Sequence, residues 1–481
     1  MLFVSSEFLI FFIIVYLLYW AAPLAWRFYV LLAASLFFYM SWSPLFALHL
    51  LAVIVINYYV LELYRRTSWK GLFVALQIAN VANIAVFKYF YFIAGTLGFL
   101  FGIDAWHADQ LRLSMRAHGN EILLPLAISF YTFQIMSYGI DLYRRTYTEK
   151  HSLTEFILFI SFFPQLIAGP IMRADDLMPQ IARLKAGHDL LIEPEQLRRG
   201  LWLLLAGIFK KVVIADTLLI WTMPAMQSSV PAATWHPVVF WQASLGFLFM
   251  LYADFSAYSD LARGFGHLLG IQVPLNFQAP FFMKSISDFW RRWHLTFSFW
   301  IRDYIFIPLG GSRGGNWQVV RNLILTFFLA GLWHGASNNF VIWGTLMGIL
   351  LALESQTFRW FPEWPRRWYG RFARLLVTWL FFVPVTLFFF VKDVAWTLSA
   401  IVWMFNPLAW LANAGNSLGN FETLMGSALA VICFHLYDEY KENLQIVRRF
   451  EGWLLPLAAL ILIGMLLEFS GKSQDFFYFQ F

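Results

Sequence analysis

The chain has 481 residues, of which 60% are hydrophobic, 20% aromatic and only 13% charged. Because a soluble domain carries roughly a quarter charged residues, this composition excludes an ordinary water-soluble protein. The net charge of +6 does not indicate nucleic-acid binding, since Lys and Arg collect in the cytoplasmic loops of membrane proteins. The single cysteine, Cys433, excludes an intrachain disulfide and a cysteine-rich metal site.

Apolar runs recur along the whole chain, and no soluble domain interrupts them. A membrane helix needs about 20 mostly apolar residues, and this length rule gives about eleven crossings. The sequence therefore predicts an all-α, polytopic transmembrane helical bundle, with interfacial or re-entrant helices besides the full spans. The runs are residues 8–26, 28–40, 45–63, 72–94, 122–140, 156–171, 201–221, 238–252, 323–353, 375–391, 394–411, 424–436 and 453–467.

Charges around the first runs predict part of the topology. Glu7 precedes the first run and Arg27 follows it, which is the reverse of a cleaved signal peptide, so we expect a retained helix with its N-terminus outside. Basic residues at Arg27 and at 65–70 then bracket a hairpin that begins and ends in the cytoplasm. One more crossing places residues 101–121 outside, and the next returns the basic residues of 144–150 to the inside.

Polar residues cluster at the end of the run 238–252. Their spacings of three and four place several of them on one helix face, where contacts between helices are the favoured explanation and a functional role is the alternative. Lys210 and Lys211 also fall within an apolar run, so the topology beyond them stays open. The polar residues are Asp254, Ser256, Ser259 and Asp260.

Two further segments carry candidate site residues. Residues 288–294 place two arginines between tryptophans and end at His294, which suits an amphipathic helix at the membrane interface. His294 is then either a residue of the interfacial belt or part of a site. Residues 302–315 end in a glycine-rich turn around Arg313, whose backbone amides can hold a phosphate of an activated acyl donor. A plain cytoplasmic turn is the alternative, since the spacing of a P-loop is absent.

The sharpest feature is the polar stretch 332–339, Leu-Trp-His-Gly-Ala-Ser-Asn-Asn, which interrupts the apolar run 323–353. A broken helix is tolerated at membrane depth only where protein or a water-filled cavity satisfies the freed backbone groups. The part before the break, 323–332, spans roughly 15 Å at the helical rise, about half of the hydrocarbon thickness. We therefore expect two half-helices that enter from the cytoplasmic side and present His334 near the middle of the membrane.

Histidine is the side chain best suited to accept and return a proton near neutral pH. A buried imidazole tends to stay neutral and is ready as a base, for example to take the proton of a hydroxyl that attacks an acyl thioester. The alternative for His334 is a structural histidine bonded to a carbonyl.

These segments together resemble the membrane-bound O-acyltransferase family. The resemblance rests on residues 274–315 (PLNFQAPFFMKSISDFWRRWHLTFSFWIRDYIFIPLGGSRGG) and 329–344 (LAGLWHGASNNFVIWG), and it extends to 125–144, 162–173 and the terminal 478–481 (YFQF). It covers most of the chain from about residue 87 onward. The bacterial branch that acts on alginate and teichoic acids is the most similar.

The resemblance implies a many-helix fold around a tunnel that crosses the membrane, with an acyl donor inside and an acceptor outside. The catalytic histidine of the family falls on His334 and its second motif histidine on His294. We assign His334 as general base and His294 as an orienting or donor-binding partner. We expect the donor to be bound by Arg313, Trp293, Trp333 and Asn339. No metal and no bound cofactor are implied, since the donor, acetyl-CoA or an acylated carrier protein, is a substrate.

Some positions depart from the family pattern. Asn338 stands where an aromatic residue is common, Met347 replaces a frequent histidine, and Ala257 replaces a usual glycine. These differences concern packing or the lining of the tunnel, so they bear on the substrate more than on the reaction. The implied organisation is a set of N-terminal helices with an outer loop (1–121), an acyltransferase core with both histidines (122–358) and C-terminal helices (359–481).

The leading hypothesis is an enzyme of the bacterial inner membrane that passes an acetyl group to a hydroxyl at the outer face. Its acceptor is an exported alginate-like polysaccharide or a periplasmic acetyltransferase partner. D-alanyl transfer to another envelope polymer is an alternative. A transporter or flippase with an intramembrane histidine is another, although such proteins usually have two corresponding broken segments and no second copy of 332–339 is found. A non-catalytic scaffold for polymer export leaves His334 without a task.

Overall fold

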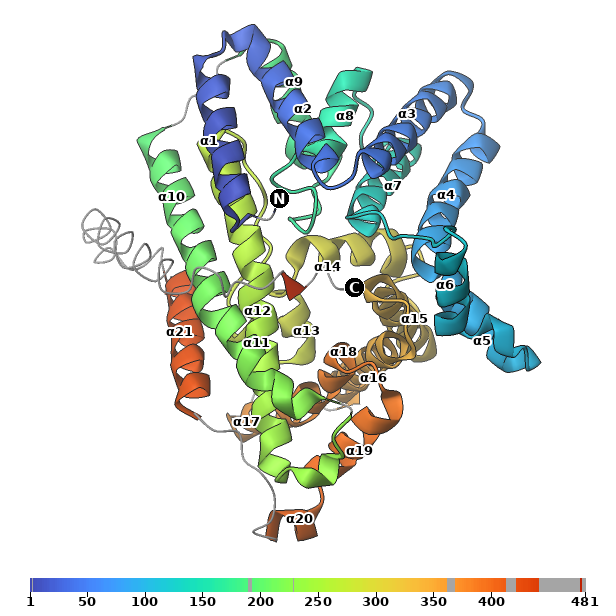
Figure 1. The fold of residues 1–481 in the computed structure, drawn as a ribbon, viewed down its shortest axis with the longest axis vertical. Helices are drawn as coiled ribbons and strands as arrows, with labels where there is room; N and C mark the ends of the chain where they lie inside the picture. The colour runs from blue at the N-terminus through green and yellow to red at the C-terminus, as the bar shows by residue number, and fades with distance from the viewer. Residues whose placement is uncertain are drawn as a thin grey trace. The chain divides into compact units, whose positions relative to one another are not determined.

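The protein is all-helical in the part of the chain that its computed structural model describes, namely residues 1, 3–188, 193–227, 229–360, 368–411, 421–440 and 476–477 (Figure 1). The predicted run 453–467 and the terminal motif 478–481 lie outside these residues. Within them, five helical segments are long and apolar enough to cross a membrane, and three apolar helices are shorter. The predicted class, a helical multi-pass membrane protein, is confirmed. The five segments are Pro44–Thr67, Lys70–Phe101, Pro237–Leu268, Asn338–Trp360 and Trp368–Phe390.

The described chain divides into two compact units. The first combines Met1–Leu201 with Leu261–Pro274, and the second combines Trp202–Asp260 with Leu275–Phe481. Helices α10 (Pro194–Phe209) and α12 (Pro237–Leu268) each run from one unit into the other. The functional division at residues 121 and 358 stays a prediction.

Local sequence fixes where the first helices begin and end. The side chain of Ser5 accepts a hydrogen bond from the amide of Phe8 at the start of α1 (Ser6–Ala21). Ser43 does the same for Phe46 at the start of α3 (Pro44–Thr67), where Pro44 stands in the first turn and needs no amide partner. Ser68 ends α3 in the left-handed conformation with a φ of 53°.

The core of the first unit is built from aromatic rings. Phe8 of α1 packs on Phe38 of α2 (Leu24–Met40) at a centroid distance of 5.7 Å and on Phe265 at 5.0 Å. Phe163 lies 5.9 Å from Phe38 in the same cluster. Helix α2 packs against α8 and α9, and α3 packs against α4. The other helices of this unit are α4 (Lys70–Ile84), η1 (Ala85–Tyr89), α5 (Phe90–Phe101), η2 (Asp104–Trp106), α6 (Ala108–Ala117), α7 (Ile128–Arg144), α8 (Leu153–Ser161) and α9 (Ala174–Lys185).

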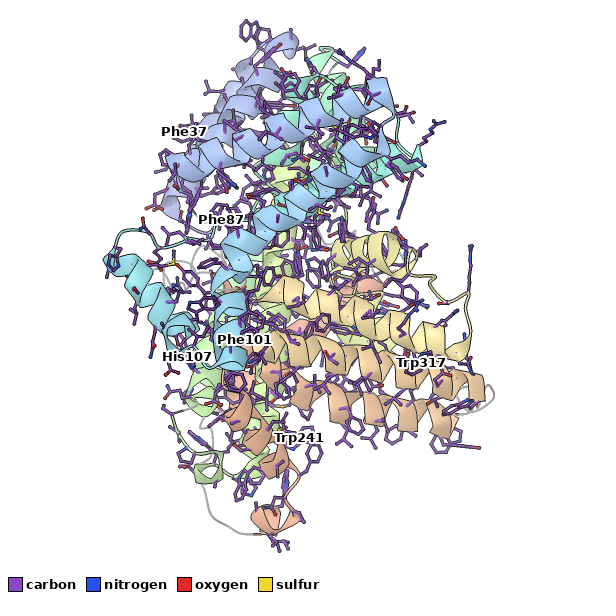
Figure 2. The ribbon with its side chains drawn as sticks, turned by 90° about the vertical axis from the view of Figure 1, so that its right-hand side faces the viewer. Phe37, Phe87, Phe101, His107, Trp241 and Trp317 are labelled. Carbon is purple, nitrogen blue, oxygen red and sulfur yellow. The ribbon has the colours of Figure 1, made fainter. Side chains whose placement is uncertain are left out.

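The second unit contains the first part of α12, up to Asp260. Two long helices, α15 (Asn316–His334) and α16 (Asn338–Trp360), lie side by side along their length, as Figure 2 shows near the label of Trp317. The remaining helices are η3 (Lys210–Ala215), α11 (Asp216–Thr222), η4 (Met223–Met226), η5 (Ala232–Thr234), η6 (Pro280–Phe282), α13 (Ile286–Trp290), α14 (Leu295–Ile301), η7 (Arg302–Phe306), α17 (Trp368–Val385), α18 (Leu387–Phe390), α19 (Val394–Met404), α20 (Pro407–Leu411) and α21 (Phe421–Tyr440).

Buried ion pairs join η3 and α11 to α12 in the second unit. The ammonium group of Lys211 lies 2.8 Å from Asp216 and 2.9 Å from Asp254, and that of Lys210 lies 2.7 Å from Asp260. The Lys211 side chain is only 1% exposed. The second oxygen of Asp254 accepts a hydrogen bond from the amide of Phe477. Asp254 and Asp260 of α12 therefore make contacts between helices, as expected, whereas the hydroxyl of Ser256 has no hydrogen-bond partner among the described residues.

Candidate active site around His334

His334 is the last residue of α15, where the helix breaks. Gly335 continues in extended conformation with a φ of −165°, and α16 begins at Asn338. A Cβ atom on Gly335 would lie 2.2 Å from the ring of Phe340, so only glycine fits at this turn. The predicted break in the helix is confirmed. The predicted half-length is wrong for both arms, because α15 has 19 residues and α16 has 23.

Three glycines let the two arms of this hairpin, α15 and α16, pack main chain against main chain. A Cβ on Gly331 would lie 2.3 Å from the carbonyl oxygen of Phe340, and one on Gly344 would lie 2.3 Å from that of Phe327. Farther along, a Cβ on Gly348 would meet the backbone of Ile324 at 2.7 Å. Small residues of this kind let membrane helices approach closely. The position of His334 is therefore fixed by contacts between the two main chains.

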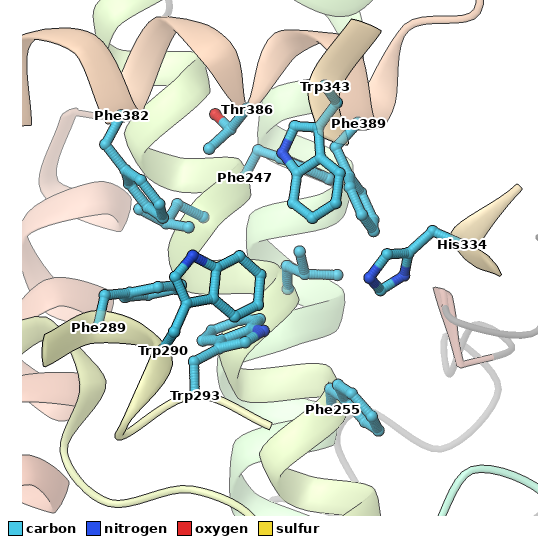
Figure 3. A pocket seen from close by; sticks show the side chains of 12 residues that line it. Phe247, Phe255, Phe289, Trp290, Trp293, His334, Trp343, Phe382, Thr386 and Phe389 are labelled. Carbon is cyan, nitrogen blue, oxygen red and sulfur yellow. The ribbon is translucent and has the colours of Figure 1, made fainter. Parts of the chain in front are cut away.

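The imidazole of His334 points into an aromatic cavity of the second unit (Figure 3). His334 carries the one titratable side chain among the twelve residues that line the cavity. Trp343 and Phe389 pack on the imidazole with ring centroids at 5.1 Å. The other lining residues are Phe247, Leu248, Leu251, Phe255, Phe289, Trp290, Trp293, Phe382 and Thr386.

His294 lies outside the lining of this cavity. It is 1% exposed and precedes α14 with a positive φ of 45°, a strained conformation for a residue that carries a side chain. The ring of Phe255, which lines the cavity, lies 4.6 Å from the ring of His294. Neither ring nitrogen of His294 has a hydrogen-bond partner among the described residues. A buried polar group without a partner is costly, which makes this histidine a candidate for contact with a ligand or water.

The expected amphipathic helix over residues 288–294 is wrong. Helix α13 ends at Trp290, and residues 291–294 separate it from α14. The two arginines therefore lie in different surroundings. Arg292 pairs with Glu439 at 3.0 Å, whereas Arg291 is exposed. The break in this segment allows His294 to turn into the interior instead of lying along an interfacial helix.

The other predicted donor-binding residues fall in different surroundings. Trp293 lines the cavity, and Trp333 stacks on Phe297 with ring centroids at 4.3 Å. The amide of Asn339 donates a hydrogen bond to the carbonyl oxygen of Val391, so this side chain ties α16 to the end of α18. Arg313 is exposed in the glycine-rich turn and is not part of the cavity lining. Binding of the donor by these four residues stays a prediction.

Glu354 of α16 is a residue that the sequence did not single out. Its carboxylate accepts hydrogen bonds from the backbone amides of Ile286 and Ser287 at the start of α13. A carboxylate at the end of an apolar run is the one available signal, because a charged residue near a membrane helix needs a partner or a task. Within the described residues, no group of three His, Cys, Asp or Glu side chains is placed to hold a metal ion.

Sequence comparison identifies the family of this chain. Residues 143–391 match the membrane-bound O-acyltransferase family. The chain is 36% identical over 418 residues to a protein of Azotobacter vinelandii named "Probable alginate O-acetylase AlgI", an alignment that covers 83% of this chain and 77% of that protein. It is 37% identical over 353 residues to the "Peptidoglycan O-acetyltransferase" of Helicobacter pylori, covering 67% of this chain and 63% of that protein.

A more distant relative has a different acyl group in its name. The "Teichoic acid D-alanyltransferase" of Bacillus subtilis is 27% identical over 259 residues, which cover 52% of this chain and 62% of that protein. All of these names describe acyl transfer by relatives of a chain with apolar helices of membrane-spanning length. The protein is thus a multi-pass membrane O-acyltransferase, and the chain belongs to the membrane-bound O-acyltransferase family.

Proposed function

We propose that this protein moves an acetyl or other short acyl group from a cytoplasmic thioester donor to a hydroxyl at the outer face of the bacterial inner membrane. The final acceptor is an exported, alginate-like polysaccharide. The observation that carries the proposal is the single imidazole of His334 in a cavity whose other lining residues, apart from Thr386, are aromatic or aliphatic. The names of the two closer relatives described above, both O-acetylating proteins, support an acetyl group and a glycan acceptor.

The chemistry needs a base, and the cavity offers one. A neutral His334 takes the proton of the acceptor hydroxyl as its oxygen attacks the carbonyl carbon of the thioester. The tetrahedral intermediate then collapses, the carbon–sulfur bond breaks, and the imidazolium returns its proton to the leaving thiolate. The products are an ester and a free thiol, so the histidine ends as it began. The aromatic walls exclude water, which otherwise competes with the acceptor as a nucleophile.

His294 has a supporting role in this proposal. It lies behind Phe255 and Phe297 instead of lining the cavity, so it does not touch the reacting carbonyl carbon directly. Its two ring nitrogens have no hydrogen-bond partner among the described residues and are available to a water molecule or to a polar group of the donor. We therefore keep it as an orienting or donor-binding residue, with Arg313 as a candidate for a phosphate of the donor.

The test compares O-acyl content of the exported polysaccharide in cells that carry wild type, His334→Ala or His294→Ala at matched membrane abundance. We expect His334→Ala to abolish O-acylation while polymer is still exported, and His294→Ala to give a partial defect. Unchanged O-acylation in His334→Ala would overturn the assignment. Loss of export together with O-acylation would instead favour a transporter or a scaffold.

The acceptor is tested in the same cells. Peptidoglycan is a second candidate, because the identity to the peptidoglycan O-acetyltransferase equals that to the alginate O-acetylase within a percentage point. Ester-linked acetate is therefore measured on exopolysaccharide and on peptidoglycan side by side. Acetate that depends on His334 and appears only on peptidoglycan would contradict the exopolysaccharide acceptor but not the reaction. Deletion of a periplasmic acetyltransferase distinguishes direct transfer from transfer through a partner.

A further inference from the structure

Helix α13 has only five residues, yet it carries much of one side of the cavity. Phe289 and Trp290 lie in it, and Trp293 follows in the next turn of chain, and all three line the cavity opposite Trp343 (Figure 3). Isolated helices of this length are unstable, because too few internal hydrogen bonds offset the ordering of the chain. The position of these rings therefore depends on what holds the start of α13.

The amides at the start of α13 are satisfied from two sources. The hydroxyl of Ser285 accepts a hydrogen bond from the backbone amide of Asp288 at 3.1 Å. The carboxylate of Asp288 accepts one from the backbone amide of Lys284 at 2.9 Å. This local cap leaves the amides of the first two helical residues, which both point at Glu354. Ile286 donates to its Oε2 at 2.7 Å and Ser287 to its Oε1 at 3.2 Å.

The hydroxyl of Ser287 donates to the same carboxylate, so Glu354 receives three hydrogen bonds from two adjacent residues. A carboxylate suits this place because it has only acceptors and two oxygens. It also carries negative charge at the positive end of a helix, where such charge is stabilising. A glutamine of the same shape would keep one acceptor oxygen. Its NH₂ group, a donor, would face a backbone N–H, which is also a donor.

Glu354 and the cavity residue Trp343 lie on the same face of α16. They are eleven residues apart, which is about three helical turns. The ring of Trp343 contacts that of Trp290 at a centroid distance of 6.1 Å. Helix α13 is thus attached to α16 at two points, by the carboxylate at its start and by a ring contact at its end. Helix α16 is also the arm that follows the break at His334.

We propose that Glu354 is a positioning residue for acyl transfer, which holds α13 on α16 so that Trp290 and Trp293 set the place of the substrate relative to His334. This inference rests on the proposed function of the cavity. Glu354 touches no lining atom of the cavity through its carboxylate and takes no proton in the reaction. Its effect is on the geometry in which the hydroxyl meets the thioester.

Two measurements on Glu354→Gln test the proposal, with Glu422→Gln as the matched control. Glu422 is exposed in the first turn of α21, so its replacement changes charge equally without touching the cavity. The first measurement is hydrogen exchange of the peptide that spans residues 284–293 in the purified, detergent-solubilised protein. We expect at least about tenfold faster exchange of its amides in Glu354→Gln and no change in Glu422→Gln, because one of the two amides at the start of α13 loses its acceptor and faces an NH₂ donor instead.

The second measurement is the kinetics of transfer from acetyl-CoA to the polysaccharide in membranes. We expect kcat/KM to fall about 10- to 100-fold in Glu354→Gln, since misplacement by about 1 Å has effects of that order. Ser287→Ala, which leaves both amides bonded to Glu354, should fall less than about threefold. Should Glu354→Gln fail to accumulate, Glu354→Asp replaces it, because the shorter carboxylate keeps the charge and loses the reach to one amide.

The outcomes separate this inference from the proposed function. Faster exchange with reduced kcat/KM supports the proposal. Faster exchange with wild-type kinetics makes Glu354 merely structural and overturns it, as does unchanged exchange. A wild-type protein that transfers no acyl group to any polymer contradicts the proposed function instead, and the exchange result still reports whether Glu354 holds α13.

Discussion

The rings of His294 and His334 both lie against Phe297, at centroid distances of 5.0 Å and 5.6 Å. Trp333 also contacts both, at 6.2 Å and 5.0 Å. Among the described residues, no hydrogen bond joins the two histidines. An aromatic pair thus stands between them, and a direct proton transfer from one imidazole to the other is not supported by this arrangement.

This separation predicts different defects for the two histidines. His334→Gln should lower kcat by about 10²- to 10⁴-fold, because the base is lost. His294→Gln keeps a polar side chain of similar reach and should lower kcat/KM by at most about 10²-fold, because only orientation suffers. The measurement is acetyl transfer in membranes at matched protein amount. Equal losses in kcat for the two variants would indicate that both histidines take part in the proton transfer.

The glycine contacts between α15 and α16 predict a large effect of one methyl group. Gly331→Ala places a Cβ 2.3 Å from a carbonyl oxygen, so we expect a loss of stability of about 1–3 kcal/mol from overpacking. The thermal midpoint of the detergent-solubilised protein should fall accordingly. Gly426→Ala in α21 is the control, because a Cβ there meets no atom of the described part of the chain within 4 Å. A midpoint of Gly331→Ala equal to that of the control would show that the hairpin tolerates a separation of α15 from α16.

The buried cluster around Lys211 predicts an order of stability. Lys211→Met leaves the carboxylates of Asp216 and Asp254 buried without this ammonium group, and breaking such a pair costs about 3–5 kcal/mol. Asp254→Asn should cost less, because the Lys211–Asp216 pair remains and the asparagine oxygen still accepts the amide of Phe477. The two variants are compared by the fraction of monodisperse protein after extraction. The reverse order would contradict the charge argument.

The surroundings of His151, between α7 and α8, predict that the stability of the protein depends on pH. Its ring accepts or donates a 2.6 Å hydrogen bond with the Tyr147 hydroxyl, and burial lowers its pKa below the usual value despite the nearby Glu149 and Glu155. The unfolded chain therefore binds the proton more readily, so the contribution of the neutral ring is present above the unfolded-state pKa of about 6.5 and is lost as the pH falls from there through the lower pKa of the folded state.

The measurement is the thermal midpoint from about pH 7.5 to about pH 5.5, where an ordinary histidine becomes charged. We expect the midpoint of wild type to fall more steeply than that of His151→Asn, which has no titrating ring. The variant starts lower because the bond to Tyr147 is weakened. Parallel slopes would assign the pH dependence to other groups.

The sequence predicted the helical membrane class and the place of the break, because Gly335 and its polar neighbours interrupt an apolar run. It did not predict the length of α15. That helix begins at Asn316, and its polar first turns are held by contacts such as the hydrogen bond from Asn322 to the carbonyl of Gly311. Contacts of this kind join residues whose distance depends on the turn between them, which periodicity does not reveal.

The residues of the candidate site could be picked out from the sequence only in part. His334 stands out in the sequence because a polar residue in an apolar run needs a task. Glu354 does not, since a carboxylate at the end of an apolar run is typical of a helix leaving the membrane. Its partners lie 68 and 67 residues earlier in the chain, at Ile286 and Ser287. Only the fold brings these groups together.

The backbone contacts of Gly331 and Gly344 separate the placement of His334 from the shape of the cavity wall. The imidazole of His334 is placed by main chain against main chain, whereas the cavity wall comes from side chains of α12, α13, α16, α17 and α18. Under the proposed function, exchange of a wall residue that does not pack on His334, such as Phe382, changes the space offered to the acyl group without moving the imidazole. Acyl preference can therefore diverge by single substitutions in such a protein while its chemistry stays the same.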